Sequence, residues 1–166
     1  ILHDRDFRIT RITLRGYASP EGTYRSNARL AEGRTGALKS YISSRYGFVD
    51  TLFVTDFVPE NWEGLRRYVA GSTLADRDGI LTLIDSDQEP DAKERAIRSR
   101  YPKAYATLLA ECYPGLRRTD YRIDYTVRSF SVDEAKAVLR TRPQNLSLDE
   151  MFAVAQTYEP GSNDFK

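Results

Sequence analysis

The residues best placed for chemistry lie between Gly16 and Ile42, where a short loop precedes a helix-forming segment. Asn27 and Arg34 are seven residues apart, almost two helical turns, so their side chains share one face of that helix. Free backbone N–H groups at the start of the helix and the Arg34 guanidinium together suit an anion. The spacing predicts a corner able to bind a carboxylate.

Cysteine and histidine chemistry is nearly excluded by count. The chain has one cysteine, Cys112, and one histidine, His3. A disulfide framework, a cysteine-histidine zinc site and most histidine-based catalysis need more of these residues. A single thiol is compatible with a reducing cytosol and with a periplasm, so the cysteine count leaves the compartment open.

Acidic residues offer two further readings, and we expect neither to be functional. Residues 85–91 alternate acids as a calcium loop does, but Pro90 stands where the loop needs glycine and no glutamate reaches the twelfth position. A solvated helix N-terminus explains them. A glycosidase-like carboxylate pair could be drawn from Glu21, Asp56 and Glu60, but no spacing distinguishes them among 24 acids. We therefore expect a protein that is not an enzyme and needs no cofactor or metal.

Length and composition bound the remaining possibilities. The 166 residues are enough for one ordinary domain with an appendage. Hydrophobic residues make up 40%, without any apolar run of the roughly 18 residues that a membrane span needs. The net charge of +1 supplies no field to gather nucleic acid. We expect no nucleic-acid partner and no membrane span in this chain.

The first half of the sequence predicts a strand, a helix and a second strand. Apolar and β-branched residues predict the first strand over 7–16, with a one-residue slip of phase that indicates either a bulge or a start near Arg11. Thr23 or Ser26 caps a helix that runs to about Ser43 and is stopped by Gly47. Inside that helix, glycines 33 and 36 predict close packing of helix on sheet. The second strand covers 52–58.

The second half predicts a helical insertion, a last strand and a helical appendage. The insertion covers residues 60–115, with a helix capped by Asn61 or Glu60, and the clearest alternation of the chain predicts a strand over 121–130. Residues 131–166 form the appendage, in which Ser147 and Glu150 make a capping box. The residues expected to build a local core in the insertion are Trp62, Leu65, Leu81, Leu83, Tyr105, Leu108 and Leu109.

Two segments together resemble a known family. They are Gly16-Tyr-Ala-Ser-Pro-Glu-Gly22 and the stretch from Asn27 through Leu30 to Arg34. The chain resembles the OmpA-like C-terminal domain, also found in MotB and Pal, whose pattern is Gly-His-Thr-Asp-x-x-Gly followed by Asn-x-x-Leu-Ser-x-x-Arg-Ala. Residues 117–118 and the strand after them look like the family's closing Arg-Arg-Val-Glu strand. The resemblance covers about residues 7–45 and 116–130.

The resemblance implies an α+β fold, a two-layer β/α/β/α/β sandwich, here with a helical insertion and C-terminal helices. It also implies non-covalent binding of the peptidoglycan stem peptide, in which an aspartate and an arginine hold the diaminopimelate zwitterion. The sequence departs from the family at the aspartate, which is Ser19, and at the histidine, which is Tyr17, while Glu21 offers a carboxylate two residues later. The ligand-binding residues implied by this comparison are Tyr17, Ser19, Glu21, Asn27 and Arg34.

These implications give the expected function and its alternative. We expect a binding and anchoring module of the cell envelope, on the periplasmic face of the outer membrane, similar to the variant domains of Bacteroidetes outer-membrane proteins. The alternative is a structural or assembly protein, associated with fimbriae or the outer membrane, whose peptidoglycan pocket is vestigial and which binds envelope or fimbrial proteins. The family's first strand and helix are expected before residue 1, and the helices of 131–166 resemble the start of a tetratricopeptide-like array.

Overall fold

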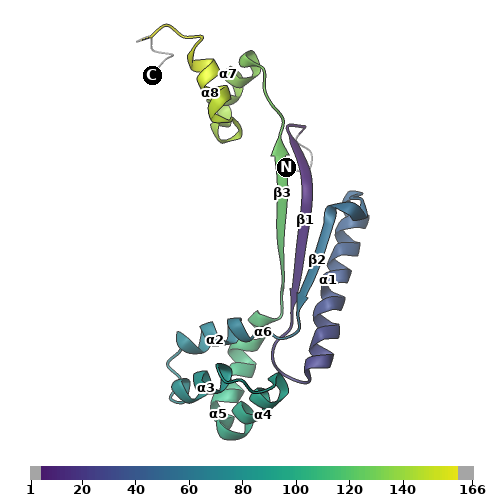
Figure 1. Cartoon of the computed structure of the whole chain (residues 1–166), viewed down its shortest axis with the longest axis vertical. Helices are drawn as coiled ribbons and strands as arrows, with labels where there is room; N and C mark the ends of the chain where they lie inside the picture. Colours follow the sequence, from purple (N-terminus) through teal and green to yellow (C-terminus); the bar gives the residue numbers. More distant parts are fainter. Residues whose placement is uncertain (1–4, 161–166) are drawn as a thin grey trace. The chain divides into compact units, whose positions relative to one another are not determined.

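The protein has an α+β fold, as the sequence predicts, with three strands in one mixed sheet and helices between and after them (Figure 1). The computed structural model describes residues 5–160, so His3 and the last six residues of the expected appendage lie outside the described part. The chain forms two compact units. Within the described residues, unit 1 comprises residues 5–10 and 125–160, and unit 2 comprises residues 11–124.

The sheet has the strand order β2-β1-β3. Its strands are β1 (Phe7–Tyr17), β2 (Phe53–Val58) and β3 (Thr119–Val127). β1 and β2 are parallel, in a register that sets Ile12 opposite Phe53 and Tyr17 opposite Val58. β3 runs antiparallel to β1: in unit 1 Arg128 N donates to Asp6 O while Thr126 Oγ1 donates to Arg8 O. Because the strand order places β3 beside β1 alone, β3 is an edge strand among the described residues.

Helix α1 (Tyr24–Tyr46) follows β1 and lies against the β1–β2 pair, as Figure 1 shows. The side chain of Thr23 accepts the backbone N–H of Ser26 and caps the helix, and Gly47, at φ 70°, ends it by donating its N–H to Ser43 O. A left-handed residue at this position favours glycine because it has no Cβ. Both predicted signals are confirmed, and the helix extends three residues beyond the predicted end at Ser43.

The close approach of helix and sheet was expected at Gly33 and Gly36, and this prediction is wrong. Both glycines are exposed, and a Cβ added to either would meet nothing within 4 Å. The close contact lies instead on the strand, at Gly16, where an added Cβ would collide with Thr35 Oγ1 and with the backbone oxygen of Ala31. The strand glycine, rather than the helix glycines, sets how near α1 lies to the sheet.

The predicted one-residue slip in the alternation of buried and exposed residues along β1 is present. Ile12, Leu14 and Gly16 are buried, whereas the consecutive residues Thr10 and Arg11 are both exposed. The strand nevertheless begins at Phe7, which removes the alternative start near Arg11.

The last strand is confirmed, but it ends at Val127 instead of Phe130. Phe130 is buried among the C-terminal helices. The apolar side of the strand is open: Tyr121 is 71% exposed and Ile123 is 39% exposed. The period-two pattern therefore identifies the strand without identifying a buried face.

Helices fill residues 62–116 between β2 and β3. They are α2 (Trp62–Ala70), α3 (Arg77–Ile84), α4 (Pro90–Arg100), α5 (Pro102–Thr107), the π-helical turn η2 (Leu108–Cys112) and α6 (Tyr113–Leu116). A short 3-10 turn, η1 (Asp50–Leu52), precedes β2. Asn61 caps α2 by accepting the N–H of Gly64 at 2.9 Å. The predicted start at Asn61 or Glu60 is thereby resolved in favour of Asn61.

These helices have their own hydrophobic core. Its buried members are Leu65, Val69, Ile80, Leu83, Ile84, Ile97, Ala104, Tyr105, Leu108, Cys112, Tyr113 and Leu116, with Trp62 and Leu81 packed against them. Leu109 was expected in this core but is exposed. The π-helical turn η2 contains it, and a wider turn shifts the residues that face inward relative to ordinary α-helical spacing.

The C-terminal helices in unit 1 are α7 (Val132–Thr141) and α8 (Leu148–Ala155), joined by the 3-10 turn η3 (Pro143–Asn145). Capping boxes start both, from Ser131 with Glu134 and from Ser147 with Glu150. The helices enclose a small core of Phe130, Ala135, Val138, Leu146 and Val154. Of the helices described, none has the length and apolar character needed to cross a bilayer.

Candidate functional site

A hollow of about 250 Å³ lies in unit 2, where the loop after β1 meets the first turns of α1. Four of the five residues expected to bind ligand line it: Ser19, Glu21, Asn27 and Arg34. Ala18, Leu30 and Arg117 complete the lining. The seven-residue spacing of Asn27 and Arg34 does place both on one side of α1, as predicted.

Arg34 is the cation of the hollow that has no acidic partner among the described residues. Its Nη1 donates to the backbone oxygen of Tyr17 at 3.1 Å, which holds the guanidinium against the end of β1. Within residues 5–160, no carboxylate forms an ion pair with it. Because one oxygen engages only part of a guanidinium's five N–H donors, Arg34 retains donors for a ligand oxygen.

Arg117 occupies the other wall and is already paired. Its Nε donates to Ser19 Oγ at 3.0 Å, and its Nη2 forms a salt bridge with Glu21 Oε1. Both side chains of the salt bridge are about one-third exposed. Glu21 therefore does supply a carboxylate beside the position where the resembled family has aspartate, but a protein arginine neutralises that charge.

Asn27 connects the hollow to a buried carboxyl group behind it. Its Nδ2 donates to Glu60 Oε1 at 2.8 Å, and Trp62 Nε1 donates to Glu60 Oε2 at 2.8 Å. Burial raises the pKa of Glu60, and the two hydrogen bonds, which lower that pKa, do not offset the burial. The repulsion from Asp91 and Glu94 adds to the rise. Glu60 thus fixes the orientation of the Asn27 amide.

Tyr17, the fifth predicted residue, contributes its backbone rather than its ring. The ring is outside the hollow lining, with the guanidinium carbon of Arg118 4.6 Å from its centroid. This distance is typical of a cation-π contact. Only the carbonyl oxygen of Tyr17 takes part in the site, by holding Arg34.

Two residues of the site were not among the predicted ligand-binding residues. Arg117 is 98 residues from Ser19 in the sequence and reaches it only because β3 pairs with β1. The Arg117-Arg118 pair before the last strand is the sequence feature that could have identified Arg117 as a site residue. Glu60 was one acid among 24, and no local pattern indicates that it is buried or that Asn27, 33 residues earlier, donates to it.

The charges of the hollow define what it can bind. Glu21 and Arg117 compensate each other, so Arg34 leaves one unmatched positive charge beside polar groups of Ser19 and Asn27. A guanidinium in this setting binds carboxylate through charge-assisted hydrogen bonds. The residues described around the hollow include no nucleophile with an adjacent base, and they suit binding of an anionic group.

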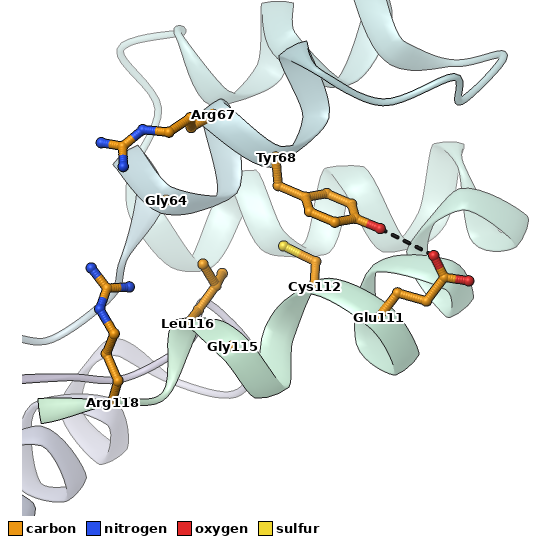
Figure 2. A pocket seen from close by; sticks show the side chains of 8 residues that line it. All are labelled: Gly64, Arg67, Tyr68, Glu111, Cys112, Gly115, Leu116 and Arg118. Carbon is orange, nitrogen blue, oxygen red and sulfur yellow. Dashed lines mark hydrogen bonds between the residues drawn. The ribbon is translucent and has the colours of Figure 1, made fainter.

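A second hollow of about 340 Å³ lies between α2 and the η2–α6 segment (Figure 2). Its cations are paired: Arg67 with Glu63 at 2.6 Å and Arg118 with Asp120 at 2.8 Å. The carboxylate of Glu111 accepts a hydrogen bond from Tyr68 Oη at 3.1 Å (Figure 2). Burial raises the pKa of the Cys112 thiol in its wall to about 11, so the sulfur is a thiol at neutral pH. The described lining of this hollow offers neither an unpaired cation nor a reactive sulfur.

Neither a metal-ligand cluster nor a known relative identifies the site. Within the part of the chain that the structure describes, no three His, Cys, Asp or Glu side chains gather as a metal-ligand set. The chain matches no protein-family model, no curated protein and no solved structure. Its membership of the OmpA-like family therefore stays a prediction from the motif.

Proposed function

We propose that the chain is a non-catalytic binding module of the OmpA-like type that captures a carboxylate of a cell-envelope peptide, with the peptidoglycan stem peptide as the ligand. The unmatched guanidinium of Arg34, in a hollow shared with Ser19 and Asn27, carries this proposal. A guanidinium binds a carboxylate with two parallel hydrogen bonds, a geometry that lysine cannot reproduce. The proposed setting is the periplasmic face of the outer membrane.

Binding of a diaminopimelate-type peptide to the purified chain tests the proposal. We expect Arg34→Ala to weaken binding by roughly tenfold to a hundredfold, because a hydrogen bond to a charged group contributes about 1.5–3 kcal/mol. Arg29→Ala is the matched control, since Arg29 is an exposed arginine of the same helix that does not line the hollow. Isothermal titration calorimetry gives the affinities.

The thermal melt of Arg34→Ala separates binding from folding. Arg34 makes one hydrogen bond to Tyr17 O, so its loss should lower the free energy of unfolding by about 1 kcal/mol or less. An unchanged affinity in Arg34→Ala would refute the proposal. A large loss of stability would assign Arg34 a structural role instead.

A second function is favoured by the pairing of Glu21 with Arg117. Among the described lining residues, this pairing leaves no free carboxylate to receive an ammonium group, and Ser19 carries no charge. In this alternative the hollow is vestigial, and the chain is a structural or assembly protein that binds envelope or fimbrial proteins. A Ser19→Asp variant discriminates the two: binding by this variant but not by the unaltered chain would favour the vestigial pocket.

A further inference from the structure

The edge strand β3 combines an unpaired backbone edge with exposed apolar side chains. It pairs with β1 on one side only, and the order β2-β1-β3 leaves its other edge without a strand among the described residues. Tyr121 and Ile123 lie along this strand, and both are exposed, Tyr121 more than Ile123. Unpaired backbone N–H and C=O groups next to exposed apolar side chains form a template for a further strand.

The hydrogen bonds to β1 reveal which residues of β3 offer their backbone groups to the open edge. Tyr17 N donates to Arg118 O, and at the other end Arg128 N donates to Asp6 O. Successive residues of a strand direct their backbone groups to alternate sides, so even-numbered residues of β3 face β1. Tyr121 and Ile123 therefore present their N–H and C=O groups outward.

We propose that β3 pairs antiparallel with β3 of a second copy of this chain, with the two-fold axis at Ile123, to form a continuous six-stranded sheet. A two-fold axis perpendicular to the sheet makes the pairing antiparallel and closes the assembly at two copies. The dimer surface is thus one strand from each chain, and Ile123 lies opposite Ile123 of the partner subunit.

Charge and strand length together select this register among those that the backbone permits. An axis at Tyr121 would also set Arg122 opposite an aspartate, Asp120, but it would pair only residues 119–123, whereas an axis at Ile123 pairs the whole of β3. With the axis at Ile123, Arg122 lies opposite Asp124 of the partner subunit, and this favourable pair occurs twice. An axis at residue 122 would set Arg122 against itself and Asp120 against Asp124, and an axis at residue 124 would set Asp124 against itself. Like charges directly opposite one another destabilise a sheet. An axis midway between residues would set outward-facing residues against inward-facing ones.

The other edge of the sheet lacks this self-complementarity. β2 contains one charged residue, Asp56, whose carboxylate already pairs with Arg15 Nε at 3.1 Å. On β3, Arg122 and Asp124 pair within one strand at 2.7 Å in the separate chain. In the dimer the same two side chains also meet their counterparts, so the four charges form one network.

Sedimentation equilibrium of the whole chain gives the first test. We expect a concentration-dependent mass that reaches twice that of one chain. Ile123→Lys places two ammonium groups at the axis and should give a monomer, whereas Val54→Lys, at an exposed aliphatic residue of β2, should dimerise normally. Unaltered chain that stays monomeric at every concentration, or dimerisation lost in Val54→Lys alone, would overturn the proposal.

Two charge variants test the register independently of stability. Arg122→Asp and Asp124→Arg each create like-charge pairs across the axis and should weaken self-association by roughly tenfold to a hundredfold. Mixed one to one, the two variants should form a heterodimer as readily as the unaltered chain dimerises, because both 122–124 pairs across the axis then join opposite charges. An ion pair within one chain cannot produce this recovery. A mixture that associates no better than the single variants would refute the register.

Discussion

Gly16 is the point at which a single added carbon should disturb the packing of α1 on the sheet. A Cβ at this position would lie 2.2 Å from Thr35 Oγ1 and 2.4 Å from Ala31 O, closer than any ordinary van der Waals contact. Thr35 is buried, and its hydroxyl donates to Ala31 O at 3.0 Å and lies 3.4 Å from Asp56 O. Gly16→Ala must therefore displace the helix or the hydroxyl.

The expected cost of Gly16→Ala follows from these contacts. Overpacking a core costs about 1–3 kcal/mol, and loss of the Thr35 hydrogen bond adds about 1 kcal/mol. We expect the free energy of unfolding of unit 2 to fall by about 2–4 kcal/mol. Urea titration followed by the fluorescence of Trp62, the single tryptophan and a residue of unit 2, measures this change.

Two controls test the reasoning. Gly33→Ala and Gly36→Ala make the same chemical change where nothing lies within 4 Å, and each should stabilise α1 by about 1 kcal/mol. Adding Thr35→Ala to Gly16→Ala should recover only part of the loss, because the collision with the Ala31 carbonyl remains. A loss below about 0.5 kcal/mol in Gly16→Ala, or destabilisation by Gly33→Ala, would refute this account of the helix–sheet contact.

Two pH-dependent predictions follow from carboxyl groups whose pKa is displaced in opposite directions. Because the pKa of Glu60 is raised in the folded state, its contribution to stability is largest at low pH and is lost as pH rises through the folded pKa. Glu60→Gln removes the titrating group, so the free energy of unfolding, measured by urea titration between pH 4 and about 7, should fall less with pH than in the unaltered chain. The Arg128 guanidinium, followed by hydrogen bonds from Ser131, lowers the pKa of Glu134 to about 2, and its stabilising effect is lost as pH falls through that value. Carbon-detected NMR should show the pKa of Glu134 higher in Arg128→Ala but still below its usual range, and an unmoved pKa would contradict the assigned cause.

The sequence predicted helix ends well where a contact or conformation within a few residues determines them. Thr23, Gly47 and Asn61 each act through a hydrogen bond or a backbone conformation within a few residues, so the sequence identifies them directly. The co-location of Asn27 and Arg34 is of the same kind, because helical spacing alone brings them to one side of α1. The α+β class follows from the order of such elements.

Other features depend on contacts between distant segments and could not be predicted from the local pattern. The contact of Gly16 with α1 involves Ala31 and Thr35, 15 and 19 residues later, so glycine content alone pointed to the wrong positions. Leu109 follows helical periodicity in the sequence, but the π-helical turn changes the phase. The partner of Glu21 comes from the far end of the helical insertion, and only the folded chain identifies it.

The topology of unit 2 by itself brings together the segments that form the hollow. β1 and β2 are parallel and end level with one another, at Tyr17 opposite Val58, so the segments that leave them start at one edge of the sheet. Ala18 N donates to Val58 O and Asn61 N donates to Ala18 O, which ties the two segments together. The approach that Gly16 permits then places the first turns of α1 against this edge. A displaced α1 would move Arg34 away from its Tyr17 carbonyl. Gly16→Ala should therefore weaken carboxylate binding and lower stability by about 2–4 kcal/mol, whereas Arg34→Ala should weaken binding with a loss of stability of about 1 kcal/mol or less.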